Sequence, residues 1–593
     1  MRPRYGCTGA LLVMCVAAAA RGSGPADYLL RLVPPDAGAT LAIEDLRGHA
    51  HDFCASPLAD GLKQLPAVQD WLKSDRYRRF ERARTEIEKT LDVPLTTIRD
   101  RLLGEAVVLS LHISPNDGPE QAQGLLLLRC RDRAWLDRLI ARLNDAEKQG
   151  GPLVDVSQRT HRNATYWVRT FRPGTKPHEY YAIVGADSFA WSNSESVMEG
   201  VLDRKAGLAP GLGDDANFRK VRDLLPDRAV ASLFVNPRFL ERLMAADPRQ
   251  KTTAEEQVSA LIARNLAAVD YAGAALEWRD GFVLHTHEAI DPSKLDEPLR
   301  RWGDRQGADP SPLLSRVPAT ALALAAGHFD FGAIHDSLMS LVPEADRLRV
   351  ENGVALLRGL LMGKDLRTEI LPCLGPSVLV FADSPRAGGD QPGHPAVVVA
   401  VNLCGEAGDR GVPAALDNAL RSFLAFYALD PARKELHLRV ESRESSGVRL
   451  TSLSGGRPFF TYAIENGLLV FGTSADAVAE YCASGSHSGA GAQFERFRAT
   501  YFPTVETFAY LDLQKLFELA DARRTPLAEQ LATRHGRSVA AARHDLDQAL
   551  ALMNLFEGAF ATSTIDRGFT AVHRTLGLIA RNPTSGGTTL SRP

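Results

Sequence analysis

The feature that most constrains the fold is an internal duplication, because residues 35–290 and 315–580 look like two copies of one unit. The segments 179–239 and 459–516 carry similar residue types in the same order and at similar spacing. Chance rarely preserves both order and spacing over such a length. The clearest correspondences are Tyr181-Ala-Ile183 with Tyr462-Ala-Ile464, Trp191 with Phe471, Phe218 with Phe494, and Val230–Asn236 with Thr507–Asp512. The duplication predicts an architecture, and it carries no chemistry by itself.

The pattern of strands and helices predicts the fold class of each copy. Consecutive strands joined by short turns favour antiparallel pairing, and helices grouped in blocks are typical of α+β proteins. The expected class is therefore α+β, with two tandem copies of a unit made of a curved antiparallel sheet and packed helices. The expected strands, in matching pairs, are 39–43 with 321–325, 103–109 with 374–380, 124–128 with 396–400, 181–183 with 462–464, 189–191 with 468–471, 272–276 with 558–561, and 281–285 with 568–572.

Two local signals refine this pattern. Asn466-Gly467 lies between apolar strands and predicts a tight hairpin, because both residues tolerate positive φ. Ser192-x-x-Glu195 and Thr473-x-x-Asp476 have the form of a capping box at the start of a helix. Helical spacing also places a set of apolar residues on one face of an early helix, namely Tyr77, Phe80, Ile87 and Leu91.

The first residues have the form of a secretory signal. Arg2 and Arg4 precede a short apolar run, which ends in small residues at Ala18-Ala19-Ala20. The alternative is a retained membrane anchor, but a span needs roughly 20 apolar residues and this run is shorter. No later apolar run is long enough, so we expect no membrane span in the mature chain and an exported, periplasmic or extracellular location.

The expected domain plan follows from the signal and the duplication. A signal peptide occupies residues 1–20, and the first and second α+β repeats occupy 35–290 and 315–580. A linker rich in Asp, Pro and Arg covers 291–314. The Ser/Thr/Gly-rich residues 581–593 form a tail that we expect to be disordered.

Composition excludes several classes of function. The formal net charge is -3 and no basic block is present, which argues against a nucleic-acid partner. The cysteines that follow the signal are odd in number and widely spaced, so they predict no disulfide framework. No Cys-x-x-Cys occurs, so a cysteine-based zinc site is not expected. These cysteines are Cys54, Cys130, Cys373, Cys404 and Cys482.

The sequence assigns no catalytic, cofactor-binding or metal-ligating residue, and it implies no cofactor. His285-Thr-His287 would point two imidazoles to one face of a strand, and two ligands are too few for a zinc site. His49-Ala-His51-Asp52, expected on a loop after the first strand, has the same shortage. Gly472-Thr-Ser474-Ala-Asp476 comes nearest to a nucleophile elbow but lacks the second glycine. Helix capping accounts for it and for Ser192-Asn-Ser194.

Three segments carry a family resemblance. Leu41–Asp45, Leu58–Trp71 and Phe189–Glu195 resemble a group of large exported proteins from planctomycete-type bacteria, known as hypothetical proteins or as a domain of unknown function. The resemblance covers most of the mature chain, and it implies export and a duplicated α+β build. It implies no activity and transfers no catalytic residue.

Two functions are compatible with these patterns. The first is a non-enzymatic binding or scaffold protein of the cell envelope, whose partner is an envelope protein or ligand of unknown identity. The alternative is an exported hydrolase whose site is too dispersed in the sequence to recognise. A wide apolar groove without perturbed ionisable groups would favour the binding protein. A convergent set of His, Asp and Ser would favour the hydrolase.

Overall fold

The computed structural model describes most of the chain. The described residues are 24–113, 122–245, 266–295, 297–304, 310–340, 342, 344–386, 393–403, 411–455, 458–483, 490–503 and 507–581. The expected signal peptide and tail lie outside them, apart from Arg581. The class is mixed α+β with antiparallel strand pairing, which confirms that part of the expectation.

The chain divides into two compact units. Unit 1 takes in residues 1–55, 72–248 and 271–278, and unit 2 takes in 56–71, 249–270 and 279–593. This division does not coincide with the expected repeat boundary. Residues 56–71 and 249–270, and the strand that begins at Gly281, lie within the expected first repeat but belong to unit 2.

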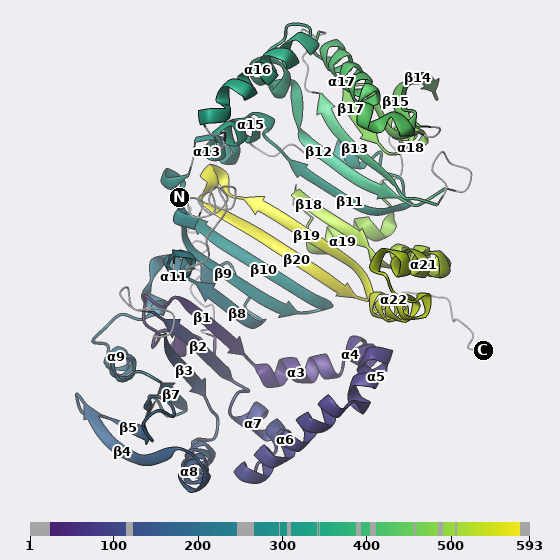
Figure 1. Cartoon of the computed structure of the whole chain (residues 1–593). Helices are drawn as coiled ribbons and strands as arrows, with labels where there is room; N and C mark the ends of the chain where they lie inside the picture. Colours follow the sequence, from purple (N-terminus) through teal and green to yellow (C-terminus); the bar gives the residue numbers. More distant parts are fainter. Residues whose placement is uncertain are drawn as a thin grey trace, which may run out of the picture. The chain divides into compact units, whose positions relative to one another are not determined.

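Unit 1 combines strands with mostly short helices (Figure 1). Its strands are β1 (Ala39–Glu44), β2 (Ala106–His112), β3 (Gln123–Arg129), β4 (Leu153–His161), β5 (Ala164–Phe171), β6 (Glu179–Ile183), β7 (Ser188–Ser192), β8 (Ala229–Val235) and most of β9 (Val269–Trp278). Its helices are α2 (Asp27–Leu30), α3 (Leu46–Cys54), α6 (Asp75–Leu91), α7 (Leu95–Arg101), α8 (Arg133–Gly150), α9 (Glu195–Lys205), η2 (Leu212–Asp214), α10 (Ala216–Arg222) and α11 (Pro237–Ala245).

Unit 2 is the larger of the two. Its strands are β10 (Gly281–Ile290), β11 (Ala321–His328), β12 (Leu374–Asp383), β13 (Ala396–Leu403), β14 (Arg439–Ser445), β15 (Val448–Ser454), β16 (Pro458–Glu465), β17 (Leu468–Gly472), β18 (Thr507–Asp512), β19 (Phe556–Ile565) and β20 (Ala571–Ala580). Its helices are α4 (Pro57–Gln64), most of α5 (Pro66–Lys73), η3 (Pro292–Lys294), α13 (Glu297–Asp304), α14 (Ser311–Leu314), α15 (Phe331–Ser340), α16 (Glu344–Leu360), η4 (Leu366–Ile370), η5 (Leu371–Cys373), α17 (Gly411–Leu429), η6 (Pro431–Leu436), α18 (Ala475–Ala483), α19 (Ala492–Tyr501), α20 (Leu513–Ala522), α21 (Arg524–His535), α22 (Val539–Met553) and η7 (Arg567–Phe569).

Each unit contains an antiparallel sheet with a defined strand order. In unit 1 the order across the sheet is β4-β5-β6-β7-β3-β2-β1-β8-β9. In unit 2 the order is β14-β15-β16-β17-β13-β12-β11-β18-β19-β20-β10. The Asn466-Gly467 hairpin forms as expected between β16 and β17, with φ of 52° and 71° at its two residues.

The core of unit 2 lies on one face of its sheet. Alternation along β11, β12, β18 and β19 places Leu324, Phe381, Tyr510 and Phe560 on that face, all of them buried. Residues of α18 and α19 join the same cluster, so these helices cover the face. The ring of Phe494 on α19 lies 5.4 Å from that of Tyr510. The sheet is therefore closed by helices on this side.

Unit 1 has a comparable arrangement. On α10, Phe218 is buried with its ring 4.7 Å from that of Phe234 on β8. A second cluster joins α8 to the hairpin of β6 and β7 through Leu136, Tyr181 and Phe189. In both units an aromatic residue near the start of a helix packs on the strand that follows it.

The expected linker, residues 291–314, contains three short helices rather than only irregular chain. Proline occupies the first turn of η3 and of α14. A proline at the first helical position loses no hydrogen bond, because that amide has no partner within the helix. The prolines that looked like loop residues therefore start helices.

Candidate functional site

The histidine clusters noted in the sequence do not form a metal centre in the described part of the chain, where no group of three or more His, Cys, Asp or Glu is placed to hold a metal ion. The expectation of a loop at His49-Ala-His51-Asp52 was wrong, because these residues lie on α3. Asp45 starts that helix in a left-handed conformation, and its carboxylate accepts a hydrogen bond from the Gly48 amide. In the described part of the chain Cys54, Cys130, Cys373 and Cys482 form no disulfide bond, and Cys404 lies outside the described residues.

The small polar triplets contain helix caps, but in both the capping residue differs from the expected one. The Ser194 hydroxyl, not that of Ser192, accepts from the Val197 amide at the start of α9. The Ser474 hydroxyl, not that of Thr473, accepts from the Ala477 amide at 3.2 Å, and the Thr473 hydroxyl accepts from the Val397 amide. The Glu195 carboxylate accepts a hydrogen bond from the Tyr166 hydroxyl at 2.6 Å instead of completing the capping box. That bond lowers the pKa of Glu195.

His287 is a half-buried titratable group of unit 2 whose pKa is strongly shifted. It lies on β10 opposite His573 on β20, and the two ring centres are 4.6 Å apart with Nδ1 facing Nδ1. Burial first, and then the neighbouring His573, lower the pKa of His287 to about 4. A neighbouring imidazole disfavours the charged form of His287. The pair bridges two strands, and among the residues that the structure describes no third ligand completes a metal site around it.

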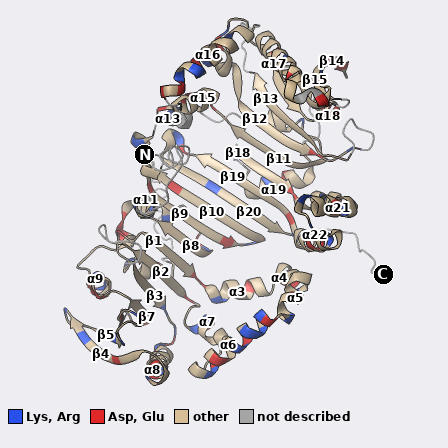
Figure 2. Cartoon of the chain, in the orientation of Figure 1, with Lys and Arg blue, Asp and Glu red and all other residues tan. Residues whose placement is uncertain are grey.

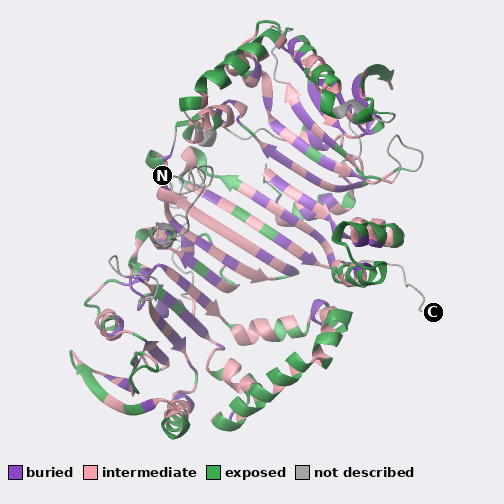
Figure 3. Cartoon of the chain, viewed as in Figure 1, coloured by how far each residue is buried: buried purple, intermediate pink, exposed green. Residues whose placement is uncertain are grey.

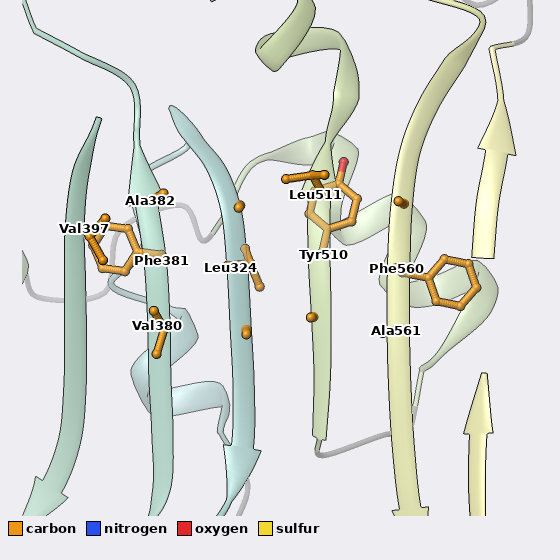
Figure 4. A pocket seen from close by; sticks show the side chains of 13 residues that line it. Leu324, Val380, Phe381, Ala382, Val397, Tyr510, Leu511, Phe560 and Ala561 are labelled. Atoms are coloured by element: carbon orange, nitrogen blue, oxygen red, sulfur yellow. The ribbon is translucent and has the colours of Figure 1, made fainter. Parts of the chain in front are cut away.

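Over its central strands, the face of the unit 2 sheet opposite α18 and α19 forms an apolar trough of about 420 Å³. Farther along the same face, α17 packs against Tyr462 and Phe471. Its floor consists of alanines from the central strands β11, β18 and β19, and β12 and β13 contribute one wall (Figure 4). The trough-facing lining residues are Ala323, Ala325, Val380, Ala382, Val397, Ala509, Leu511, Ala559 and Ala561. We call this set the alanine trough.

Strand alternation explains why the alanine trough exists. On β11 the odd-numbered residues Ala323 and Ala325 face the trough, and Leu324 between them faces the buried core. On β12, Val380 faces the trough with 37% of its surface exposed, and Phe381 faces the core. Large residues therefore fill the helix-covered side, and methyl-sized residues lie on the open side.

The backbone around the trough offers no free hydrogen-bonding groups to a ligand. Each of the five lining strands has a paired strand on both sides, so its amides and carbonyls are engaged in the ladder. Figure 2 shows these strands with few charged residues. A polar ligand would lose its hydration here without replacement, which is unfavourable. The trough is suited to hydrocarbon.

The apolar surface continues beyond the trough onto β20 and β10. Ala561 pairs with Leu576, and Leu576 pairs with Leu284. Leu576 is 49% exposed, which is unusual for leucine in the middle of a paired sheet. Figure 3 shows this mixture of exposed and half-buried residues along β20 and β10. The open face thus has a leucine ridge beside the alanine floor.

One face of the unit 1 sheet is also apolar but carries larger side chains. There Leu109, Leu111 and Leu233 are 44%, 48% and 42% exposed. On the central strands of unit 1, Leu41 of β1 pairs with Leu233 of β8. On those of unit 2, Ala325 of β11 pairs with Ala509 of β18. The difference between leucine and alanine accounts for a hollow in unit 2.

Unit 1 carries a buried charge cluster instead. Arg169 on β5 has only 2% of its side chain exposed. Its guanidinium donates to Asn144 at 3.0 Å, to Glu147 at 2.5 Å and to Glu179. Its carbon atom Cζ lies 5.3 Å from the centre of the Trp191 ring. The satisfied donors indicate a structural role for this cluster.

Sequence reasoning missed the trough, and comparison with known proteins adds no further assignment. Scans against family models, curated proteins and solved structures found no match for the chain. Among the described residues, no helix combines the length and the apolar character that crossing a bilayer requires.

Proposed function

We propose that this chain is an exported binding protein of the cell envelope, built from two copies of one α+β unit, whose alanine trough holds the hydrocarbon chain of a lipid. The observation that carries the proposal is the open, purely apolar trough of about 420 Å³ on an otherwise paired sheet. Export rests on the N-terminal sequence pattern.

The strand orders support descent from one duplicated unit. Adding ten to each strand label of unit 1 reproduces the order of unit 2 from β14 to β19. Nine strands have many possible orders, and simple meanders would not place β1 between β2 and β8. Two unrelated folds would not be expected to share this order.

The register supports the same descent residue by residue. One row of paired residues crosses the unit 1 sheet through Gln158, Trp167, Tyr181, Trp191, Leu126, Leu109, Leu41, Leu233 and Ala274. The matching row in unit 2 runs through Ser442, Thr451, Tyr462, Phe471, Val399, Val380, Ala325, Ala509 and Ala561. The sequence pairs Tyr181 with Tyr462 and Trp191 with Phe471 occupy equal positions in these rows.

The size and chemistry of the trough support a single hydrocarbon chain as the occupant. Small-molecule pockets hold about 300–1,000 Å³, and the trough lies near the lower end of that range. Each buried methylene contributes about 0.8 kcal/mol. A chain that buries about ten methylenes therefore gains about 8 kcal/mol. This gain sets about 1 μM as the tightest expected Kd, because the cost of association is subtracted from it.

The two units supply a matched pair of variants to test this proposal. Ala325→Leu with Ala509→Leu fills the trough with the side chains that unit 1 carries in the same row. Leu41→Ala with Leu233→Ala makes the converse change in unit 1 and is the control. Both changes lie on open sheet faces, so neither overpacks a core.

Diphenylhexatriene is a suitable probe because it is a neutral rod-shaped hydrocarbon that fluoresces in apolar surroundings. The full chain should bind one molecule with a Kd in the micromolar to millimolar range, and the trough-filling variant should bind at least ten-fold more weakly. The control variant should retain binding. Equal binding by the wild type and the trough-filling variant, at unchanged melting temperature, would contradict the proposed site.

A further inference from the structure

We infer that the ligand of the alanine trough is a fatty acid whose carboxylate binds Arg574 at the polar end of the open face. This inference rests on the proposed function and adds the charge and orientation of the ligand. Its basis is a change from apolar to polar residues between two neighbouring rows of the same sheet face.

The last apolar row contains Ala561, Leu576 and Leu284, which are paired across β19, β20 and β10. Two residues further along these strands, on the same face, Ser563 pairs with Arg574 and Arg574 pairs with Thr286. Thr507 of β18 pairs with Ser563 and extends this polar row. Hydroxyl groups and one guanidinium thus lie directly beside the hydrocarbon surface.

In the other direction the face stays apolar. The row that contains Leu511, Ala559 and Leu578 continues to Phe282 on β10. A bound amphiphile is therefore oriented, with its tail over the alanines and its head toward the polar row. A ligand without a polar head would leave those polar groups unused but would still fit the trough.

Arg574 can accept an anionic head although it already has a partner. Glu288 receives a hydrogen bond from Nη1 of Arg574, and 47% of the arginine side chain is exposed. A guanidinium has five N–H donors in a planar fork, so one carboxylate does not exhaust it. Arginine forms paired hydrogen bonds with carboxylates in many binding sites. Glu288 positions the guanidinium and also competes with the ligand for it.

The test compares two competitors of equal chain length, dodecanoate and dodecanol, for displacement of diphenylhexatriene from the full chain at neutral pH. Dodecanoate should displace the probe at a concentration about ten-fold lower than dodecanol. Arg574→Gln should abolish that preference and leave displacement by dodecanol unchanged. Glu288→Gln should lower the concentration of dodecanoate that displaces the probe about three-fold, because it removes a competing carboxylate. Arg439→Gln, on the exposed strand β14, is the control and should alter neither competitor.

The outcomes separate this inference from the proposed function. Equal displacement by the two competitors, or a preference that survives Arg574→Gln, overturns the fatty-acid inference and leaves a neutral hydrocarbon ligand. Absence of probe binding, or binding that neither competitor displaces, overturns both. A melting temperature for Arg574→Gln near that of the wild type ensures that a lost preference does not reflect unfolding.

Discussion

Replacing His287 with glutamine should remove a pH-dependent weakness between β10 and β20. His287 faces His573 across the strand pair, with His285 on its own strand and Asp566 just before β20. Burial and the neighbouring imidazole lower the pKa of His287 to about 4, against an ordinary value of 6.5. The folded chain therefore favours the neutral ring.

Because folding lowers the pKa of His287, the stability of this strand pair falls as the pH falls. Above pH 6.5 the ring is neutral in both folded and unfolded chains, and its contribution to stability is fully present. As the pH falls from 6.5 toward 4, the unfolded chain takes up the proton first, and stability is lost. A pKa shift of one unit corresponds to about 1.36 kcal/mol, so the shift of His287 from 6.5 to about 4 corresponds to about 3 kcal/mol. His287 is only half-buried, and solvent screening reduces this to about 1.5 kcal/mol.

Hydrogen–deuterium exchange of peptides from β10 and β20 gives the opening free energy of this strand pair at each pH. Between pH 7 and pH 4.5 the opening free energy of the wild type should fall by about 1.5 kcal/mol more than that of His287→Gln. His544→Gln removes an exposed histidine of α22 and serves as the control, with a smaller effect on the slope. Parallel pH curves for the wild type and His287→Gln would refute the coupling of the two rings.

Four further predictions concern stability, export and metal. Arg169→Ala removes the buried cation of this cluster and leaves Glu147 and Glu179 with the partly exposed Lys176. It should destabilise unit 1 by about 3 kcal/mol in chemical denaturation, whereas an unchanged midpoint would show that the buried cluster contributes nothing. Phe494→Ala should cost about 3–5 kcal/mol in unit 2, because the ring is fully buried among aromatics; a loss below 1 kcal/mol would contradict that packing. N-terminal sequencing of the exported chain should begin near Arg21, and retention of Met1 would refute cleavage. Elemental analysis after dialysis should find no stoichiometric zinc or copper, and one metal per chain would refute this.

The α+β class and the local hairpins were predictable because they depend on short-range patterns. Asn466-Gly467 marks its turn through backbone preference alone, and Tyr181 and Trp191 meet across the hairpin of β6 and β7 as their spacing suggests. Capping was predictable in kind but not in position. Ser192 and Ser194 are both suitable caps, and only the tertiary contact of Glu195 with Tyr166 decides between them.

The trough could not be predicted from the same patterns. Ala321–His328 reads as a strand apolar on both faces, which usually indicates burial on both sides. In the structure one of those faces is open. No local sequence signal distinguishes an alanine covered by a helix from an alanine on an open face. The apolar face expected on α6 gives a second example. None of its residues is buried, and Phe80 and Ile87 are 53% and 46% exposed.

Because the strands that carry the alanine trough are paired on both sides, substitutions during evolution can reshape the hollow without moving the backbone. The depth of the hollow depends only on side-chain length at a few positions, because every strand below it is fixed on both sides by its neighbours. Enlarging alanine to valine or leucine would shorten or close the hollow without moving the main chain. The shape of the hollow can therefore change by single substitutions, independently of the scaffold.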